Sequence, residues 1–269
     1  NKGWKVTSIS IKKPSKKRFI SGVKYILLDL TKKSNLDKKL ADNYSYIVNL
    51  SGHTSNLYSL KLKKKIFKSH FDGAKNLIDF FKGKNIKKFI QTGSSAEYGK
   101  ANSPLKESLN CRPNNIYGLA KLKATKYVLD AAKKKQVPAI VLRFFQVYGP
   151  KQGKNRAVMQ ILKFCLNKKI FPASDGKQIR DFCFIKDAIE AINLSMKSKI
   201  SGKLINIGFG KGISMKKLIM TIRKISGGGT PKFGLYKSRN HENPNLVPSI
   251  TRARKILNWS PKVKIEKGI

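Results

Sequence analysis

The chain has 269 residues, of which 40% are apolar, and it carries a formal net charge of +44 at pH 7. This length allows one large core or two smaller ones, and the apolar fraction suits a globular protein. No apolar run approaches the roughly 18 residues of a membrane-spanning helix, and no signal peptide is recognisable, so we expect a cytoplasmic protein with no membrane partner. Three widely spaced cysteines, Cys111, Cys165 and Cys183, form no metal-binding pattern. We expect reduced thiols and no metal site.

The basic charge is the first feature that suggests a function, because basic surfaces attract nucleic acids. The lysines are spread along the whole chain without a basic tail, however, and arginine is scarce. Arginine is the better reader of phosphates and bases. We therefore interpret most lysines as solvated surface and do not expect a nucleic-acid partner, although a basic nucleic-acid-binding protein is the alternative function. A positive field also attracts small anions such as nucleotide diphosphates.

Short apolar runs alternate with helical patterns over residues 1–149. The expected strands are Val6–Ile11, Tyr25–Leu28, Tyr46–Leu50, Phe89–Thr92 and Ala139–Phe145, and the expected helices are Asn35–Asp42, Leu57–Phe81 and Asn115–Lys135. The strands lack a clean polar alternation, which indicates burial on both faces, as in a parallel sheet. This order predicts an α/β fold with a doubly wound parallel sheet.

A sheet of this kind should begin with a strand, a glycine-rich turn and a helix whose N-terminus binds the pyrophosphate of a dinucleotide. The chain opens instead with NKGWKVTSIS, which we interpret as the end of that helix and the second strand. The first βα unit is therefore expected to be missing from residues 1–269, and an inactive truncated fragment is a further alternative. Gly208–Gly212, after an expected strand at Leu204–Ile207, is a weak candidate for a phosphate-binding loop.

After Gly149 the pattern changes to helical stretches separated by loops that contain proline and glycine. These helices are expected at Arg156–Asn167, Asp187–Met196 and Met215–Ile225. We interpret residues 150–269 as a smaller, mostly helical substrate-binding region, with residues 176–210 able to return in part to the sheet.

Tyr117 and Lys121 lie four residues apart in the expected helix 115–135, so their side chains share one face. An ammonium group beside a phenol lowers the phenol pKa and makes it a usable general base near neutral pH. Ser94 follows the expected strand 89–92, at the sheet edge where ligands bind, and its hydroxyl could bond the oxygen that exchanges the proton. The three residues predict proton transfer coupled to hydride transfer. The spacing alone is no rarer than chance in so lysine-rich a chain. The alternatives are a helix cap or turn residue for Ser94, a half-buried core ring for Tyr117 and a solvated charge for Lys121.

A series of motifs in fixed order resembles the extended short-chain dehydrogenases/reductases, the NAD-dependent epimerase/dehydratase group that acts on nucleotide sugars. The motifs are SSAEYG at 94–99, NIYGLAK at 115–121, LRFFQVYGP at 142–150, RDFCFIKD at 180–187, NIG at 206–208 and LNWSP at 257–261. The resemblance implies a Rossmann domain over residues 1–149, NAD or NADP as cofactor, and a nucleotide-diphosphate sugar as substrate.

The resemblance also implies roles for individual residues. Tyr117 would be the general base and acid, Lys121 would hold the cofactor ribose and tune Tyr117, and Ser94 would orient the sugar hydroxyl or keto oxygen. Further cofactor-binding residues would be Asp29, Leu30, Leu50, Ser51 and Gly52. Substrate-binding residues would be Ser95, Gln146, Arg180, Arg239 and Glu242, with the arginines facing the diphosphate. Ordinary surface ion pairs remain the alternative for Arg180–Asp181 and Arg239–Glu242.

Departures from the family pattern narrow the expected reaction. Dehydratases carry Asp-Glu after the catalytic Ser or Thr, where this chain has Ser95 and Ala96, so dehydration is not expected. SSAEYG and FFQVYGP most resemble 4-keto-6-deoxy-sugar reductases and related epimerases of surface-polysaccharide synthesis, which predicts a nucleotide-sugar 4-epimerase or 4-ketoreductase.

Other departures bear on the ligands. Gln146 and His70 replace asparagines that approach the sugar in the family, so the identity of the sugar is left open. Lys12 and Lys13, with no acidic residue nearby, slightly favour NADP over NAD. The long helices suggest a homodimer, as in many extended family members.

Overall fold

The computed structural model describes residues 3–41, 43–53, 60–236 and 243–269. Its main sheet has four parallel strands in the order β3-β4-β5-β9. These strands are β3 at Tyr46–Asn49, β4 at Lys88–Ser94, β5 at Ala139–Phe144 and β9 at Lys203–Ile207. Residues of β4 and β5 are buried almost throughout, as the lack of a polar alternation in these strands predicts. The α/β fold with a parallel sheet is therefore confirmed.

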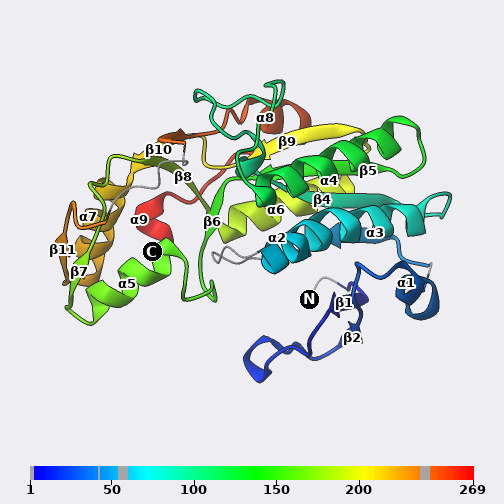
Figure 1. Cartoon of the computed structure of the whole chain (residues 1–269), viewed down its shortest axis with the longest axis horizontal. Helices are drawn as coiled ribbons and strands as arrows, with labels where there is room; N and C mark the ends of the chain where they lie inside the picture. The colour runs from blue at the N-terminus through cyan, green and yellow to red at the C-terminus, as the bar shows by residue number, and fades with distance from the viewer. Residues whose placement is uncertain (1–2, 42, 54–59, 237–242) are drawn as a thin grey trace.

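Helices cover both faces of this sheet (Figure 1). On one face lie α3 (Gly73–Phe81) and α4 (Ile116–Lys133), whose apolar side chains share a core with Phe89 and Val141. On the other face lie α6 (Ile185–Lys197) and α8 (Thr251–Leu257), packed with Ile90, Ile140 and Leu142. Neighbouring residues of one strand thus enter different cores, because side chains alternate along a strand.

The first two strands form a separate parallel pair, β1 (Val6–Ser10) and β2 (Val23–Leu27), joined through a 3-10 turn at Lys16–Arg18. Figure 1 shows this pair apart from the main sheet, close to α1 (Lys33–Lys39). Within the described residues, β1 and β3 each have a strand on one side only. Ile9 and Ile26 nevertheless pack against the same core as α3. The parallel strands are therefore divided by a seam between β1 and β3.

The helix expected at 57–81 is continuous over its described part but changes its winding. It comprises α2 (Leu60–Phe67), a π-helical segment (Lys68–Asp72) and α3. The spacing of apolar residues does not reveal the π-helical turn. The one extra residue in that turn rotates the helix only about as far as its apolar stripe is wide, so the pattern continues. The turn carries His70 inward, where it is buried.

The second region lies at one end of the molecule and surrounds a third core (Figure 1). Its helices are α5 (Ala157–Leu166), α7 (Met215–Ser226) and α9 (Ile265–Gly268). In its longer sheet, β8 (Ile179–Phe184) pairs with β6 (Gln146–Tyr148), β10 (Gly212–Ser214) and β12 (Asn245–Leu246), while β7 (Ile170–Pro172) pairs with β11 (Thr230–Lys232). The region holds more strand than the sequence pattern suggested. Most of its strands have only two or three residues, too few to show periodicity, and the six-residue β8 contains Arg180 and Asp181, which interrupt its apolar run.

Candidate active site

Ser94 is the last residue of β4 and the N-cap of a short 3-10 helix, Ser95–Glu97. Its hydroxyl oxygen accepts a hydrogen bond from the Ala96 N–H at 3.2 Å, and its own main-chain N–H donates to Glu97 Oε1 at 2.7 Å. This reciprocal capping box holds Ser94 at the carboxyl edge of the sheet. Ser94 is thus a cap, as one alternative held, but its hydroxyl proton is still available to donate to another oxygen.

Tyr117 and Lys121 reach the same place from α4. The helix begins where the Asn115 side chain accepts a hydrogen bond from the Gly118 N–H at 2.8 Å. One turn further, the Lys121 ammonium donates to the main-chain carbonyl of Thr92 at 2.9 Å and is buried over the end of β4. The Ser94 side chain is close enough to the Tyr117 phenol for its hydrogen-bonding effect to lower the pKa of Tyr117. The structure therefore brings Ser94, Tyr117 and Lys121 together.

Burial dominates the charge states of these groups. It raises the pKa of Tyr117 above its ordinary value of 10, while the bond to Ser94 lowers it and the charge of Glu97 raises it further. Burial lowers the pKa of Lys121 to about 8, and Glu97 opposes that shift. The expected lowering of the Tyr117 pKa by Lys121 is not found, because desolvation of the phenolate is the larger effect.

His70 lies against Tyr117, with the two rings edge to face and their centroids 4.9 Å apart. Its Nε2 is 3.1 Å from the His53 carbonyl oxygen, and its buried Nδ1 has no partner among the described residues. Burial and then the charge of Lys121 lower the pKa of His70 to about 4, so the imidazole is neutral at pH 7. On its other side, Gly52 has a φ of +142°, and a Cβ there would lie 1.8 Å from the ring.

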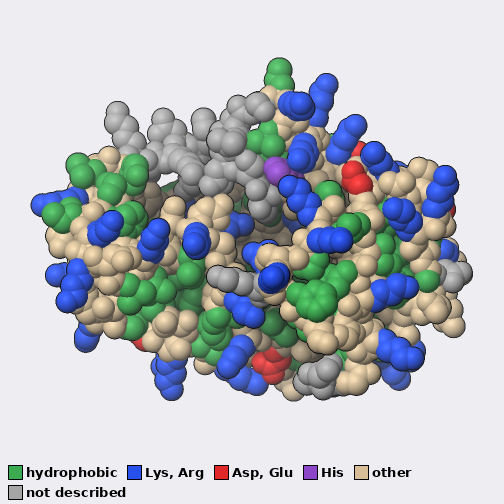
Figure 2. Space-filling model, turned by 90° about the horizontal axis from the view of Figure 1, so that it is seen from below, with side chains coloured by type: hydrophobic (Ala, Val, Ile, Leu, Met, Phe, Trp, Pro, Cys, Tyr) green, Lys and Arg blue, Asp and Glu red, His purple; other side chains and the backbone are tan. Residues whose placement is uncertain are grey.

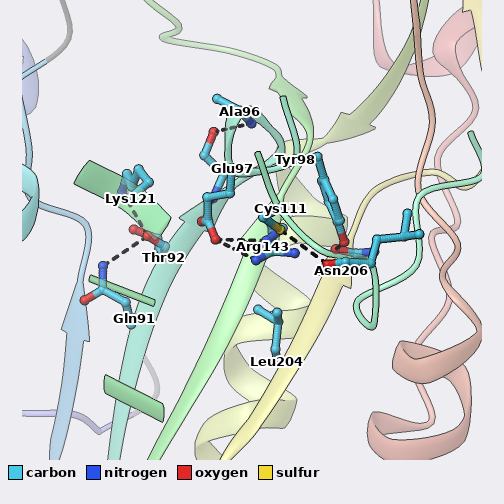
Figure 3. A network of polar contacts seen from close by, with 12 residues as sticks. Gln91, Thr92, Ala96, Glu97, Tyr98, Cys111, Lys121, Arg143, Leu204 and Asn206 are labelled. Atoms are coloured by element: carbon cyan, nitrogen blue, oxygen red, sulfur yellow. Dashed lines mark hydrogen bonds and ion pairs between the residues drawn. The ribbon is translucent and has the colours of Figure 1, made fainter. Parts of the chain in front are cut away.

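The loop after β3 is tied to the same group by buried amides. Asn49 Oδ1 accepts from the Ser51 N–H at 3.0 Å and from its hydroxyl at 2.6 Å, while Asn49 Nδ2 donates to Gln91 Oε1 at 2.9 Å. Gln91 Nε2 then donates to the Thr92 carbonyl, which also accepts from Lys121. The expected cofactor loop and the expected catalytic lysine therefore share one network, of which Figure 3 shows Gln91, Thr92 and Lys121.

The described residues fit part of a dinucleotide cofactor. Leu50 is apolar yet 69% exposed at the carboxyl edge of β3, where the ring of a bound ligand would cover it. Asp29 and Leu30 follow β2, with Asp29 Oδ1 accepting from the Thr31 N–H and hydroxyl, and Leu30 packing near Gly73. A glycine-rich turn between a strand and a helix suited to pyrophosphate is not found in the described ranges.

Gly208–Gly212 does not supply that turn. The N–H groups of Phe209 and Gly210 donate to the two oxygens of the buried Asp181 carboxylate, at 2.7 and 2.6 Å. Burial raises the pKa of Asp181 to about 7, and these N–H groups oppose that shift. The N–H groups of this loop therefore already bind the protein's own Asp181 side chain.

The remaining expected residues are dispersed. Ser95 is buried in the 3-10 turn, and Gln146 is exposed at the start of β6. Arg180 lies in β8, where its Nη1 donates to the main-chain carbonyls of Ile179 at 2.8 Å and Pro244 at 3.2 Å. Arg239 and Glu242 lie outside the described residues.

A buried ion pair behind Ser94 escaped the sequence reasoning. Arg143 in β5 donates to Glu97 Oε2 through Nη2 at 2.7 Å and Nε at 3.1 Å. The Tyr98 ring stacks on the guanidinium, and its hydroxyl donates to Asn206 at 2.8 Å (Figure 3). The signal was present in the sequence, since Arg143 is the only charged residue within the apolar run Ala139–Phe145.

The surface shows no basic stripe on the face seen in Figure 2, where Lys and Arg side chains are scattered among other residues. Within the described part of the chain, no helix combines the length and apolar character needed to cross a bilayer. There, too, no cluster of His, Cys, Asp and Glu suited to a metal ion occurs.

The sequence was compared with protein families and with known proteins. The NAD-dependent epimerase/dehydratase family model matches residues 1–208. A Bacillus subtilis (strain 168) protein, described as the uncharacterized UDP-glucose epimerase YtcB, is 30% identical over 199 residues, 72% of this chain. The match spans 61% of that relative's own length. UDP-glucuronate 4-epimerase of Thermodesulfobacterium geofontis (strain OPF15) is 26% identical over 91% of this chain and 77% of its own.

Solved structures of proteins with similar names have a similar fold. UDP-glucuronic acid 4-epimerase from Bacillus cereus, in complex with UDP-glucuronic acid and NAD, superposes with a TM-score of 0.80 at 26% identity, over 93% of this chain and 80% of that one. UDP-glucose 4-epimerase from Thermotoga maritima, with UDP-glucose, gives a TM-score of 0.88 at 22% identity, over 99% and 88%. The second likeness concerns the fold alone.

Proposed function

The chain belongs to the NAD-dependent epimerase/dehydratase family, and we propose that it is a nucleotide-sugar 4-epimerase or 4-keto-6-deoxy-sugar reductase in surface-polysaccharide precursor synthesis. The observation that carries this proposal is the convergence of Ser94, Tyr117 and Lys121 at the end of β4. The UDP-sugars named for the relatives support a nucleotide-sugar substrate. Dehydration is not proposed, because Ser95 and Ala96 follow Ser94 and neither side chain is an acid that could protonate a leaving hydroxyl.

In the proposed reaction the protein handles the proton at the sugar C4 oxygen. The Ser94 hydroxyl donates a hydrogen bond to that oxygen, and Tyr117 gives it a proton during reduction. In the oxidising direction Tyr117 must first release its own proton to solvent, and the phenolate then takes the proton of the C4 hydroxyl. The raised pKa keeps Tyr117 a phenol at pH 7, which suits proton donation to a keto oxygen. A bound NAD or NADP supplies the hydride chemistry at C4.

The remaining site residues would hold the ligands. Lys121 would bond the cofactor ribose, and Asp29, Leu30, Leu50, Ser51 and Gly52 would line the cofactor. Ser95, Gln146, Arg180, Arg239 and Glu242 would contact the substrate. NADP remains slightly favoured by the exposed Lys12 and Lys13 after β1, although the Bacillus cereus neighbour binds NAD. Comparing kcat/KM with added NADPH and NADH tests this preference.

The test of the proposed function is Tyr117→Phe, assayed with UDP-glucose, UDP-glucuronic acid and a UDP-4-keto-6-deoxy sugar. Loss of general acid-base catalysis should lower kcat by about 100-fold or more. Tyr127→Phe is the matched control, because Tyr127 lies on the same helix but bonds Asp79 at the surface of α3. Turnover by Tyr117→Phe close to that of the wild type would show that the proton-transfer assignment is wrong.

A basic nucleic-acid-binding protein is the second candidate, favoured only by the net charge of +44. Salt-sensitive retention on RNA that survives Tyr117→Phe and is lost when surface lysines are reversed to glutamate would support it.

A further inference from the structure

Glu97 and Arg143 form a buried ion pair (Figure 3), and Glu97 also accepts the main-chain N–H of the proposed catalytic serine, Ser94. Glu97 is 0% exposed and the Arg143 side chain is 1% exposed. Such a pair loses the hydration of both charges, and apolar residues of similar volume are often as stable or more so. Stability alone therefore does not account for two charges at this position.

The two oxygens of the Glu97 carboxylate have different partners. Oε2 accepts both hydrogen bonds from Arg143, whereas Oε1 accepts the main-chain N–H of Ser94 at 2.7 Å. Arg143 lies in β5 beside Gly93 of β4, so the pair sits across the strand junction that ends at Ser94. The position of Ser94 is thus fixed through Glu97 to a neighbouring strand of the main sheet.

The charge of Glu97 also acts on both other members of the site. It raises the pKa of Tyr117 and that of Lys121, and it is the acidic side chain that affects both. Removing this charge should therefore ease ionisation of the phenol and loss of the lysine proton.

We propose that Glu97, anchored by Arg143, is a positioning residue of the site: one oxygen fixes Ser94, and the buried negative charge stands beside the Tyr117–Lys121 pair. This proposal rests on the function proposed above. A neutral or mobile side chain at position 97 would leave Ser94 less well placed and Tyr117 more readily ionised.

The test compares Glu97→Gln with the double variant Glu97→Gln/Arg143→Met. The single change keeps the size of the side chain but leaves the Arg143 charge unpaired, so that variant could fail to fold. The double change removes both charges and remains informative. In the double variant we expect kcat to fall by about 10-fold or more with KM little changed, since a misplaced hydroxyl weakens the reaction more than binding.

Two readouts separate positioning from mere stability. The limb of the kcat/KM pH profile that Tyr117→Phe abolishes should move to lower pH by about half a unit or more in the double variant. Independently of turnover, phenolate absorbance gives the Tyr117 titration as the difference between each protein and its Tyr117→Phe version. Its midpoint should also fall.

The matched control is Asp187→Asn. Asp187 is another buried carboxylate that accepts a main-chain N–H, from Val263 at 3.0 Å, but it lies in α6. We expect it to lower Tm without moving the pH profile or the Tyr117 titration. If the double variant behaved in the same way, losing only Tm, the positioning role would be wrong. If its titration midpoint fell while Tyr117→Phe kept full turnover, the charge effect would stand and the proposed function would fall.

Discussion

Lys121 and His70 are buried beside the half-buried Tyr117, and desolvation is the largest influence on the pKa of each of the three. Burial favours the neutral form of all three side chains. The phenol is therefore protonated and the imidazole uncharged at pH 7, while the lysine titrates near 8. With a pKa of about 8, Lys121 is the one of the three that is still mostly charged at pH 7, so a bound anion or cation can shift its protonation.

The buried His70 gives a testable dependence of stability on pH. Its pKa falls from an ordinary 6.5 to about 4 on folding, so the unfolded chain binds more protons between these values. Stability is therefore retained above pH 6.5 and lost as the pH falls toward 4, by up to about 3 kcal/mol. Urea unfolding of His70→Asn should show a shallower loss over this window than the wild type.

The control for that experiment is His53→Asn. This change removes a second described histidine but keeps the main-chain carbonyl that faces His70 Nε2. Its pH dependence should match the wild type. Equal slopes for His70→Asn and the wild type would mean that His70 is already protonated, or solvated, in the folded protein.

Among single residues, the sequence located the candidate catalytic groups better than their surroundings. The order of the motifs singled out Ser94, Tyr117 and Lys121, and the structure places them together. The lowered Tyr117 pKa was not found, because a pattern of residues contains no information on burial. Glu97 and Arg143 went unnoticed because they are 46 residues apart and only the β4–β5 pairing joins them.

Among the elements, α4 approaches the 94–97 turn unusually closely. A Cβ on Gly118 would lie 2.4 Å from the Ala96 carbonyl oxygen and 3.0 Å from Pro113. We predict that Gly118→Ala pushes α4 away from Ser94, although alanine favours a helix by up to about 1 kcal/mol over glycine. A displacement of this kind can lower kcat by about 100-fold, which steady-state kinetics would measure.

Gly73→Ala is the matched change for this prediction. Gly73 begins α3 within a continuous helix, and its added Cβ would meet Leu30 at an ordinary 3.5 Å. We expect Gly73→Ala to raise Tm slightly and to leave kcat unchanged. Wild-type kcat in Gly118→Ala would show that the approach of α4 is not needed.

Two sequence motifs, LNWSP and RDFCFIKD, could be recognised in the sequence although the contacts that they make in the fold could not. Trp259 of LNWSP donates its indole N–H to the Asp187 carbonyl at 3.0 Å, and Asp187 closes the RDFCFIKD motif. Asp181 of that motif captures the glycine-rich loop 208–210. These motifs are recognised by their spacing, but they act through contacts between distant segments, which spacing does not reveal.

On the scale of the whole molecule, the parallel strands are divided at the seam between β1 and β3. A doubly wound sheet of this class places its first strand between the second and the fourth. The seam between β1 and β3 is that position. The expectation that the first βα unit is missing stays a prediction, and the seam is where its strand would lie. The domain limits at 149–150 remain a prediction, and β9 returns to the main sheet from beyond them.

The net charge governs the last prediction, which concerns stability in salt. The 14 acidic residues can neutralise only a minority of the 58 basic ones, so repulsion among surface lysines opposes the folded state. The Debye length, over which charges are screened, falls from about 30 Å at 0.01 M salt to about 3 Å at 1 M. Tm should therefore rise by several degrees from 0.01 M to 0.5 M NaCl, measured by circular dichroism.

A charge-reduced variant provides the control. Lys63, Lys64 and Lys65 are exposed on α2, and changing all three to glutamine should raise Tm at low salt and flatten its dependence on NaCl. A Tm that falls as salt is added would mean that attraction, not repulsion, dominates the surface. RNA offers a separate comparison, because a nucleic-acid-binding protein would gain Tm from RNA at low salt and lose that gain at high salt. An enzyme with merely solvated lysines should show the NaCl effect without a specific response to RNA.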